Sequence, residues 1–553
     1  MKLTKIFSTT VVALGAVLAL SGCIRETFPK ESTITEGQLM SGQMDVVAGN
    51  LIKGVPSAMM YVALGSEHCD FGYHSMGGYN DHACQLICTN GWTMGQAPAY
   101  NRFYPAAWGR GYAENGYMAS FGWYSYYPII KNCNDVIKLV EGNDDLKHYS
   151  AVARTYRALF YLDLARLYEC LYANVDNGGD GYANQQILVA GLTVPIVNEN
   201  TTEKAATDNP RATREEMFKF IFEDLAFAES VFSGDYTPSA QTDPTLAVVY
   251  GLYARAYLWL GGFNDGLSGE LPESNAAYQK AAEYARLAIT AFGGAIMNES
   301  EWTNPVTGFN TKASSWMWTL FHSTDTVINN LYQFPAHFAP EADYGYAPLT
   351  CPGVSKLSYE RLSNTDFRKK LMKGPENSWE QFKAYTLLNS IEEYNNFADY
   401  TFFKFRPGQG NRTEYKTAGS VSLPLMRCEE MYFIEMEAMA HYNEAAAWDL
   451  LYTFMASRDS NYACLTQDLV DEIIFQKGIE FWGEGLLMFD MKRLDMGVNS
   501  AFPGTNYDEQ RRFKTEGRVP WWTYCIPQGE MQLNTALSGK NNPDPSNSLK
   551  TVK

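Results

Sequence analysis

Positive charge is scarce in this chain of 553 residues. Lys and Arg number 44 against 62 Asp and Glu, which gives a formal net charge of −18 at pH 7. Because nucleic-acid binding needs clustered basic side chains that release counterions, this balance argues against DNA or RNA as a partner. Only 19% of the residues are charged and 46% are hydrophobic, so the chain can bury a large core and is not expected to be disordered.

Long apolar runs are absent after residue 20. No later stretch reaches the ~18 uninterrupted apolar residues that a membrane-spanning helix needs. The first twenty residues hold Lys2, Lys5 and the apolar run Val11–Leu20. A basic start followed by a short apolar run is typical of a secretory signal and is too short for a spanning helix.

The signal ends at Leu20-Ser21-Gly22-Cys23, which resembles the bacterial lipobox. We therefore expect residues 1–22 to be a lipoprotein signal peptide and Cys23 to carry the lipid. Several acyl chains on one residue anchor a protein stably, since each buried methylene contributes about 0.8 kcal/mol. Residues 23–42 are polar and are expected to form a lipid-anchored tether. The alternative is an ordinary signal with an incidental cysteine.

The number of cysteines excludes a complete disulfide framework. Ten cysteines leave nine if Cys23 is lipidated, and an odd number cannot all pair. One cluster allows a zinc site or a local disulfide, although the adjacent His68 and Cys69 are hard to direct at one ion. Simple burial is the favoured interpretation. The cluster consists of His68, Cys69, His74, His82, Cys84 and Cys88.

Aromatic residues, by contrast, are abundant, with 12 Trp, 36 Tyr and 30 Phe. Many tyrosines lie at helical steps and are expected to pack between helices. Others gather in two stretches without helical periodicity, residues 65–116 and 293–422, where they alternate with Gly, Asn, Pro and Thr. Such irregular stretches on a rigid scaffold are where binding sites tend to lie. A short strand is expected at Trp316–Phe321.

Apolar residues at steps of three and four predict a mainly α-helical chain. Two helices, at residues 244–260 and 278–291, start about 34 residues apart, which is the period of tetratricopeptide helix pairs. Asp243 is the expected N-cap of the first. Repeats are expected at about 117–292 and 423–494, within one domain over 43–553. The other predicted helices are 117–140, 149–172, 213–232, 423–442, 446–458 and a long final one at 468–494.

Three motifs in the last third of the chain resemble the SusD/RagB family of Bacteroidetes lipoproteins. The first is Arg-x-x-Glu-x-Tyr-x4-Glu-Ala at residues 427–438. The second, at residues 480–493, is similar to Glu-x3-Glu-Gly-x-Arg-x2-Asp-Leu-x-Arg, and the third is Ile-Pro-x2-Glu at residues 526–530. Arg157-Ala158 and Arg255-Ala256 also fit family helices, so the resemblance covers nearly the whole mature chain.

The chain departs from the family pattern at three positions in and just before the second motif. Gln476-Lys477 stands where the family has Glu-Arg, and Leu487 where it has Arg. These departures are expected to weaken a buried ionic network. Charged residues at helical steps are by default such a network rather than a catalytic set. The charged residues concerned are Glu480, Glu484, Asp490 and Arg493.

The resemblance implies a surface-exposed, outer-membrane lipoprotein of SusD-like fold that binds glycans and is not an enzyme. It would capture oligosaccharides and deliver them to a partner SusC-like TonB-dependent transporter. In the family, the loops before the first repeat and the insertion build the ligand surface. The corresponding residues expected to bind glycan are Trp92 beside Asn90, Tyr346 in Gly345-Tyr346, and then Tyr344, Tyr100, Arg102, Trp108 and Trp302.

Three alternatives stay open at this point. The cargo could be a peptide, or the protein could only seal a transporter. A lipid-anchored glycoside hydrolase built as a helical toroid would instead need two carboxylates ~5–9.5 Å apart, for which Glu67, Asp70 and Asp343 are candidates by location alone. No cofactor is expected. Calcium is conceivable, but no Asp-x-Asp-x-Asp-Gly loop is present and the metal content stays unknown.

Overall fold

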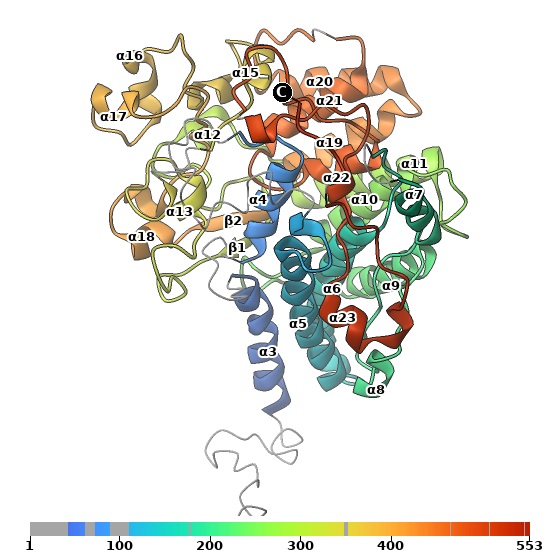
Figure 1. Ribbon diagram of the computed structural model, residues 1–553. Helices are drawn as coiled ribbons and strands as arrows, with labels where there is room; N and C mark the ends of the chain where they lie inside the picture. Colours follow the sequence, from blue (N-terminus) through green and yellow to red (C-terminus); the bar gives the residue numbers. More distant parts are fainter. Residues whose placement is uncertain are drawn as a thin grey trace, which may run out of the picture. The chain divides into compact units, whose positions relative to one another are not determined.

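The computed structural model describes residues 43–60, 72–88, 110–175, 179–347, 352–464, 466–507, 509–546 and 548–552. The chain from Asn50 onward forms one compact unit, and the residues up to Gly49 are assigned to another. The fold is mainly helical, as predicted (Figure 1). Within the described ranges, no helix is long and apolar enough to cross a membrane.

Long helices make up most of the scaffold. Six predicted helices, from 117–140 to 446–458, match observed ones to within a few residues, whereas the helices at 44–60, 73–83 and 179–188 were not predicted. Consecutive helices pack on each other, notably α5 on α6 and α10 on α11, and α6 and α11 in turn pack on α9 and α19. Their bounds are α3 (Met44–Met60), α4 (Tyr73–Ala83), α5 (Tyr117–Leu139), α6 (Lys147–Tyr168), α7 (Gly179–Leu188), α9 (Arg214–Phe232), α10 (Leu246–Gly261), α11 (Ser274–Phe292), α19 (Cys428–Ala440), α20 (Glu444–Met455), α21 (Leu469–Glu480) and α22 (Leu487–Arg493).

Short elements fill the stretch between α11 and α19, which was predicted to be irregular. They are α12 (Glu299–Thr303), α13 (Pro335–Phe338), α15 (Lys356–Arg361), α16 (Trp379–Phe382), α17 (Ile391–Asn395) and α18 (Tyr415–Gly419); α8 (Glu203–Ala206) and α23 (Gln528–Leu533) lie elsewhere in the chain. The expected strand is present as β1 (Trp316–Phe321). It pairs antiparallel with β2 (Ser422–Arg427), with Trp316 opposite Arg427 and Phe321 opposite Ser422.

Helix starts depend on local side-chain contacts. At α9, the Thr213 hydroxyl accepts a hydrogen bond from the Glu216 backbone N–H, and the Glu216 carboxylate accepts one from the Thr213 N–H, which forms a capping box. The predicted cap of α10 is wrong. Thr245 precedes that helix, and the Asp243 carboxylate instead accepts the backbone N–H groups of Ser239 and Ala240.

Three predicted segments differ from the structure. Residues 423–442 are not one helix, because β2 runs to Arg427 before α19 begins; Pro424 disfavours the helical conformation at the residue before it. Residues 65–116 are not wholly irregular, since α4 lies within them. The final helix 468–494 is broken into α21 and α22 by a turn in which Gly483 and Gly485 have φ of 81° and 78°.

The turn at Gly485 is enforced by close packing on α4. A Cβ at Gly485 would lie 2.1 Å from the Cα of Gly77, and the positive φ favours glycine independently. The backbone N–H groups of Gly483 and Gly485 donate to Oδ2 of Asp81 at 2.7 and 3.2 Å. The break therefore arises from a contact between segments about four hundred residues apart, which helical periodicity does not reveal.

The described cysteines support burial rather than cross-linking. Cys84, Cys88, Cys133, Cys170, Cys428, Cys464 and Cys525 form no disulfide, and all but Cys464 are buried. His74 Nε2 contacts the Pro424 carbonyl at 3.2 Å, and His82 Nδ1 contacts Arg511 at 2.9 Å. No group of three or more His, Cys, Asp or Glu poised for a metal ion occurs among the residues the structure describes. His68 and Cys69 lie outside them.

Candidate functional site

Tyr344 and Tyr346 belong to a stretch that we call the aromatic segment, residues 329–347. It begins with a tight turn in which Oδ1 of Asn329 accepts the backbone N–H groups of Leu331 and Tyr332 at 2.7 and 2.9 Å. The buried Gln333 side chain donates to the Asn329 carbonyl at 2.8 Å and accepts the Tyr344 hydroxyl at 3.1 Å. One amide side chain thus links Asn329 at the start of the segment to Tyr344 near its end.

Backbone geometry fixes the position of Tyr346. Its N–H donates to the Ala336 carbonyl at 2.9 Å, and its ring centroid lies 5.5 Å from that of His337. Gly345 between the two tyrosines has φ of 65°, and a Cβ there would lie 2.6 Å from the Asn330 carbonyl oxygen. Only glycine fits this turn without strain. Both tyrosines therefore extend from a backbone whose path is set before any ligand arrives.

Arg412 and Glu341 connect the aromatic segment to residues 386–412. The Arg412 guanidinium donates to the Glu341 carbonyl at 2.9 Å and to the Asp343 carboxylate at 2.8 Å. The buried Glu341 carboxylate accepts from Arg406 and from Thr386, each at 2.6 Å. These partners come from residues 386 to 412, so no local motif could have revealed them. Sequence reasoning missed them for that reason.

The two tyrosine side chains are neither core nor fully exposed. Each is half-buried, and Asp343 beside them is exposed. Burial raises the pKa of Tyr344 far above its ordinary range, with a smaller contribution from the Glu414 carboxylate, so the phenol stays a hydrogen-bond donor. A held aromatic ring next to polar side chains suits a ligand that has both an apolar face and hydroxyl groups, as a sugar does.

The other predicted binding residues divide into two groups. Asn90, Trp92, Tyr100, Arg102 and Trp108 lie outside the described residues, as does Cys23. Trp302 is described and is wrongly predicted as a ligand contact. Its side chain has 0% exposure, and its indole N–H lies 3.4 Å from Glu480 inside the molecule. A ring without exposed surface cannot stack on a glycan.

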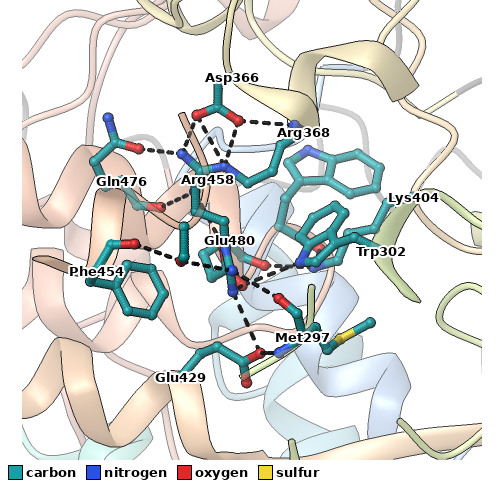
Figure 2. Close-up of polar contacts among 12 residues, drawn as sticks. Met297, Trp302, Asp366, Arg368, Lys404, Glu429, Phe454, Arg458, Gln476 and Glu480 are labelled. Carbon is teal, nitrogen blue, oxygen red and sulfur yellow. Dashed lines mark hydrogen bonds and ion pairs between the residues drawn. The ribbon is translucent and has the colours of Figure 1, made fainter. Parts of the chain in front are cut away.

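Trp302 belongs instead to what we call the Glu480 ion cluster, which comprises Trp302, Glu480, Glu484, Glu429, Arg368, Arg427, Arg458 and Lys404. Figure 2 shows the side chains of Arg368 and Arg458 converging on Glu480. Glu480 accepts from Arg458 at 3.0 Å through each carboxylate oxygen, and from Arg427 and Arg368 at 3.2 Å. Burial by itself raises the pKa of Glu480, but the guanidinium groups of Arg458, Arg427 and Arg368 overcome it and hold that pKa well below its usual range.

The remaining motif residues are paired in the same way. Glu484 accepts from Lys404 at 2.6 Å, and Asp490 contacts Lys477 at 2.7 Å and Arg493 at 3.0 Å. Burial lowers the pKa of Lys404 to about 8. Each carboxylate already has a cationic partner, so the motif is structural, as expected from its spacing.

The departures from the family motif are accommodated within this interior. Lys477 forms the ion pair with Asp490, and Gln476 accepts a hydrogen bond from Arg368 while donating to Glu472 at 2.8 Å. Leu487 packs beside Gly478. The expected weakening therefore does not leave Gln476 or Lys477 without a partner.

Comparison with known proteins agrees with the fold and the motifs. Residues 104–258 match a SusD-like family described as starch-binding and associating with the outer membrane, and residues 326–544 match the SusD family. No curated protein sequence is similar enough to match the chain.

Several solved structures share the fold. A SusD-like carbohydrate-binding protein from Bacteroides vulgatus has 20% identity and a TM-score of 0.66, covering 90% of this chain and 98% of its own. Surface glycan-binding protein A from Bacteroides thetaiotaomicron, in complex with laminarihexaose, has 16% identity and a TM-score of 0.62, covering 90% and 99%. A laminarin-binding SusD-like protein has 16% identity and a TM-score of 0.60, covering 88% and 97%.

The chain belongs to the SusD/RagB family, whose members are non-catalytic glycan-binding proteins associated with the outer membrane. The hydrolase alternative is thereby set aside. Of its candidate acids, Glu67 and Asp70 lie outside the described residues, and Asp343 is ion-paired with Arg412 at 2.8 Å.

Proposed function

We propose that this protein is a surface lipoprotein, anchored through Cys23, that captures oligosaccharides and delivers them to a SusC-like TonB-dependent transporter. The observation that carries the proposal is the pair of half-buried tyrosines, Tyr344 and Tyr346, held on both sides of a glycine that no other residue can replace without strain. Stacking on such held rings costs little side-chain entropy, because their rotamers are already restricted.

The acidic composition favours uncharged cargo. A net charge of −18 repels anionic ligands and does not oppose neutral sugars. Two proteins of the same fold are described as binding laminarin or laminarihexaose, so β-1,3-linked gluco-oligosaccharides are the first ligands to test. Weak binding at each copy suits a protein that must release its cargo to a transporter, since many copies on one surface raise the effective concentration.

The test is affinity electrophoresis of the soluble mature protein with laminarin, other glycans and a peptide panel. We expect the double substitution Trp92→Ala with Tyr346→Ala to abolish retention by the retarding glycan while the melting temperature changes little, because Tyr346 is half-buried rather than core. The matched control is Tyr172→Ala, which removes a tyrosine that is 56% exposed elsewhere on the chain.

Two outcomes would contradict the proposal. Unchanged retention in the double variant would place the site elsewhere, and a large drop in melting temperature would show that the two rings are core residues. Retention by peptides alone would identify the cargo as peptide, and release of a hydrolysis product would contradict the binding-protein assignment.

A further inference from the structure

Two exposed carboxylates, Asp343 and Glu414, lie next to Tyr344 of the aromatic segment. Asp343 precedes Tyr344 in the chain, and its backbone N–H donates to the Arg412 carbonyl at 2.8 Å. Glu414 is the N-cap of α18, which packs against α13 of the segment (Figure 1). Burial and, to a smaller extent, the Glu414 carboxylate raise the pKa of Tyr344, so this second carboxylate acts on the phenol.

The Arg412 guanidinium beside these carboxylates is already engaged within the protein. It donates to the Glu341 carbonyl at 2.9 Å and to the carboxylates of Glu393 and Asp343, each at 2.8 Å. The Arg412 side chain is only 14% exposed, whereas that of Asp343 is 47% exposed. A carboxylate on a ligand would have to displace one of these partners before it could form a charge-assisted hydrogen bond with Arg412.

Negative charge is in excess among the charged side chains of these two stretches. The carboxylates are Asp343, Glu393 and Glu414, and the cations are Arg412 and Lys416. Consecutive Cα atoms are about 3.8 Å apart, and charges act over a Debye length of about 8 Å at physiological salt. A sugar ring that packs on the tyrosines therefore lies within electrostatic reach of the excess carboxylate charge, even where it does not touch it.

We propose that Asp343 and Glu414 are specificity-determining residues, which make the aromatic segment bind neutral glycans in preference to glycans that carry carboxylates, such as those built from uronic acids. A neutral sugar meets no repulsion at this site, whereas each uronate brings a charge that the two exposed carboxylates oppose. The inference rests on the function proposed above, because it concerns ligands of the same tyrosines. It goes further by assigning the discrimination to two side chains rather than to the net charge of the whole chain.

The experiment compares ligands that share a backbone and differ in charge. Isothermal titration calorimetry on the soluble mature protein uses laminarihexaose, cellohexaose and maltohexaose, each paired with its counterpart oxidised at C6 to carboxylates. We expect the neutral member of a pair to bind more tightly to the parent. Asp343→Asn with Glu414→Gln should reduce this preference about threefold or more, because two exposed charges are removed and each contributes modestly.

The matched control is Asp135→Asn with Glu141→Gln, in and just after α5, which changes the net charge of the chain equally. These two carboxylates are 54% and 62% exposed and pair with Lys131 and Lys138 at 2.6 and 2.7 Å. The control should keep the parent's preference for neutral ligands. Raising NaCl to about 1 M, where the Debye length is about 3 Å, should lessen that preference in the parent more than in the site variant.

The ratio of the two affinities separates specificity from folding, because a folding defect would weaken both members of a pair alike. The inference is overturned if the parent binds the oxidised member at least as tightly, or if the site variant keeps the parent's preference. It is also overturned if the control loses the preference equally, which would assign the discrimination to net charge. In these three cases a glycan still binds and the function proposed above stands. If no hexasaccharide of either kind binds, both are overturned.

Discussion

The Glu480 ion cluster and the aromatic segment both combine aromatic rings with charged side chains, but they expose them differently. In the cluster, Glu480, Arg427 and Trp302 are at most 1% exposed. In the aromatic segment, Tyr344 and Tyr346 stay half-buried and Asp343 is exposed beside them. The same residue types are therefore buried in one place and partly exposed in the other.

The two regions differ in how their polar side chains are paired within the protein. Three guanidinium groups surround Glu480 at 3.0 to 3.2 Å, so the charges in the cluster are compensated inside the protein. Tyr344 and Tyr346 are positioned by one side-chain and one backbone hydrogen bond, and both residues stay half-buried. A motif rich in carboxylates can thus be purely structural, while a short tyrosine pair without a charged motif is the better binding candidate.

The largest effect is expected when the ion cluster is broken. Glu480→Ala leaves Arg368, Arg427 and Arg458 buried without their shared carboxylate, which should lower the free energy of unfolding by about 3–5 kcal/mol. Urea denaturation measures the loss. Glu223→Ala, at an exposed position of α9, is the control and should change stability by less than ~0.5 kcal/mol. A loss as small as that of the control would show that the cluster is not a source of stability.

Acid should weaken the cluster progressively. The pKa of Glu480 is lower in the folded than in the unfolded protein. Below the unfolded value of about 4.3, the unfolded chain therefore binds the proton more readily, which lowers the free energy of unfolding. The contribution is complete above that pH and is lost as the pH falls toward the folded pKa. We expect the urea concentration at the unfolding midpoint to decrease as the pH is lowered from about 4.5 to about 3.

The matched variant for this pH series is Glu480→Gln, which has no proton to bind at this position. Its stability should depend on pH less steeply, by up to about 1.4 kcal/mol per pH unit. Parallel pH profiles for the parent and Glu480→Gln would contradict the shifted pKa of Glu480.

The smallest effect is expected in the aromatic segment. Tyr344→Phe removes the hydroxyl that donates to Gln333 at 3.1 Å and should cost about 0.5–1.5 kcal/mol. Glycan retention should persist, because the ring face remains. Thermal melting and affinity electrophoresis measure the two effects, with Tyr442→Phe, at an exposed position, as the control. A stability loss equal to that of Glu480→Ala would remove the contrast between the two regions.

Much of the scaffold could be predicted because helical periodicity is local. The helices at 117–139 and 214–232 begin and end within one residue of their predicted limits. The break between α21 and α22 could not be predicted, since Gly485 packs on Gly77 of α4 and the turn exists only when the two segments meet. The same holds for Arg412 and Glu341, which support the tyrosines from distant positions.

The sequence by itself determined the acidic character, the mainly helical scaffold, the family motifs and their structural rather than catalytic role, because these depend on composition and on spacing along one chain. Only the tertiary structure decided that Trp302 is core and that Tyr344 and Tyr346 are half-buried. Exposure and pairing depend on which distant segments cover a side chain, and that is settled only when the chain has folded.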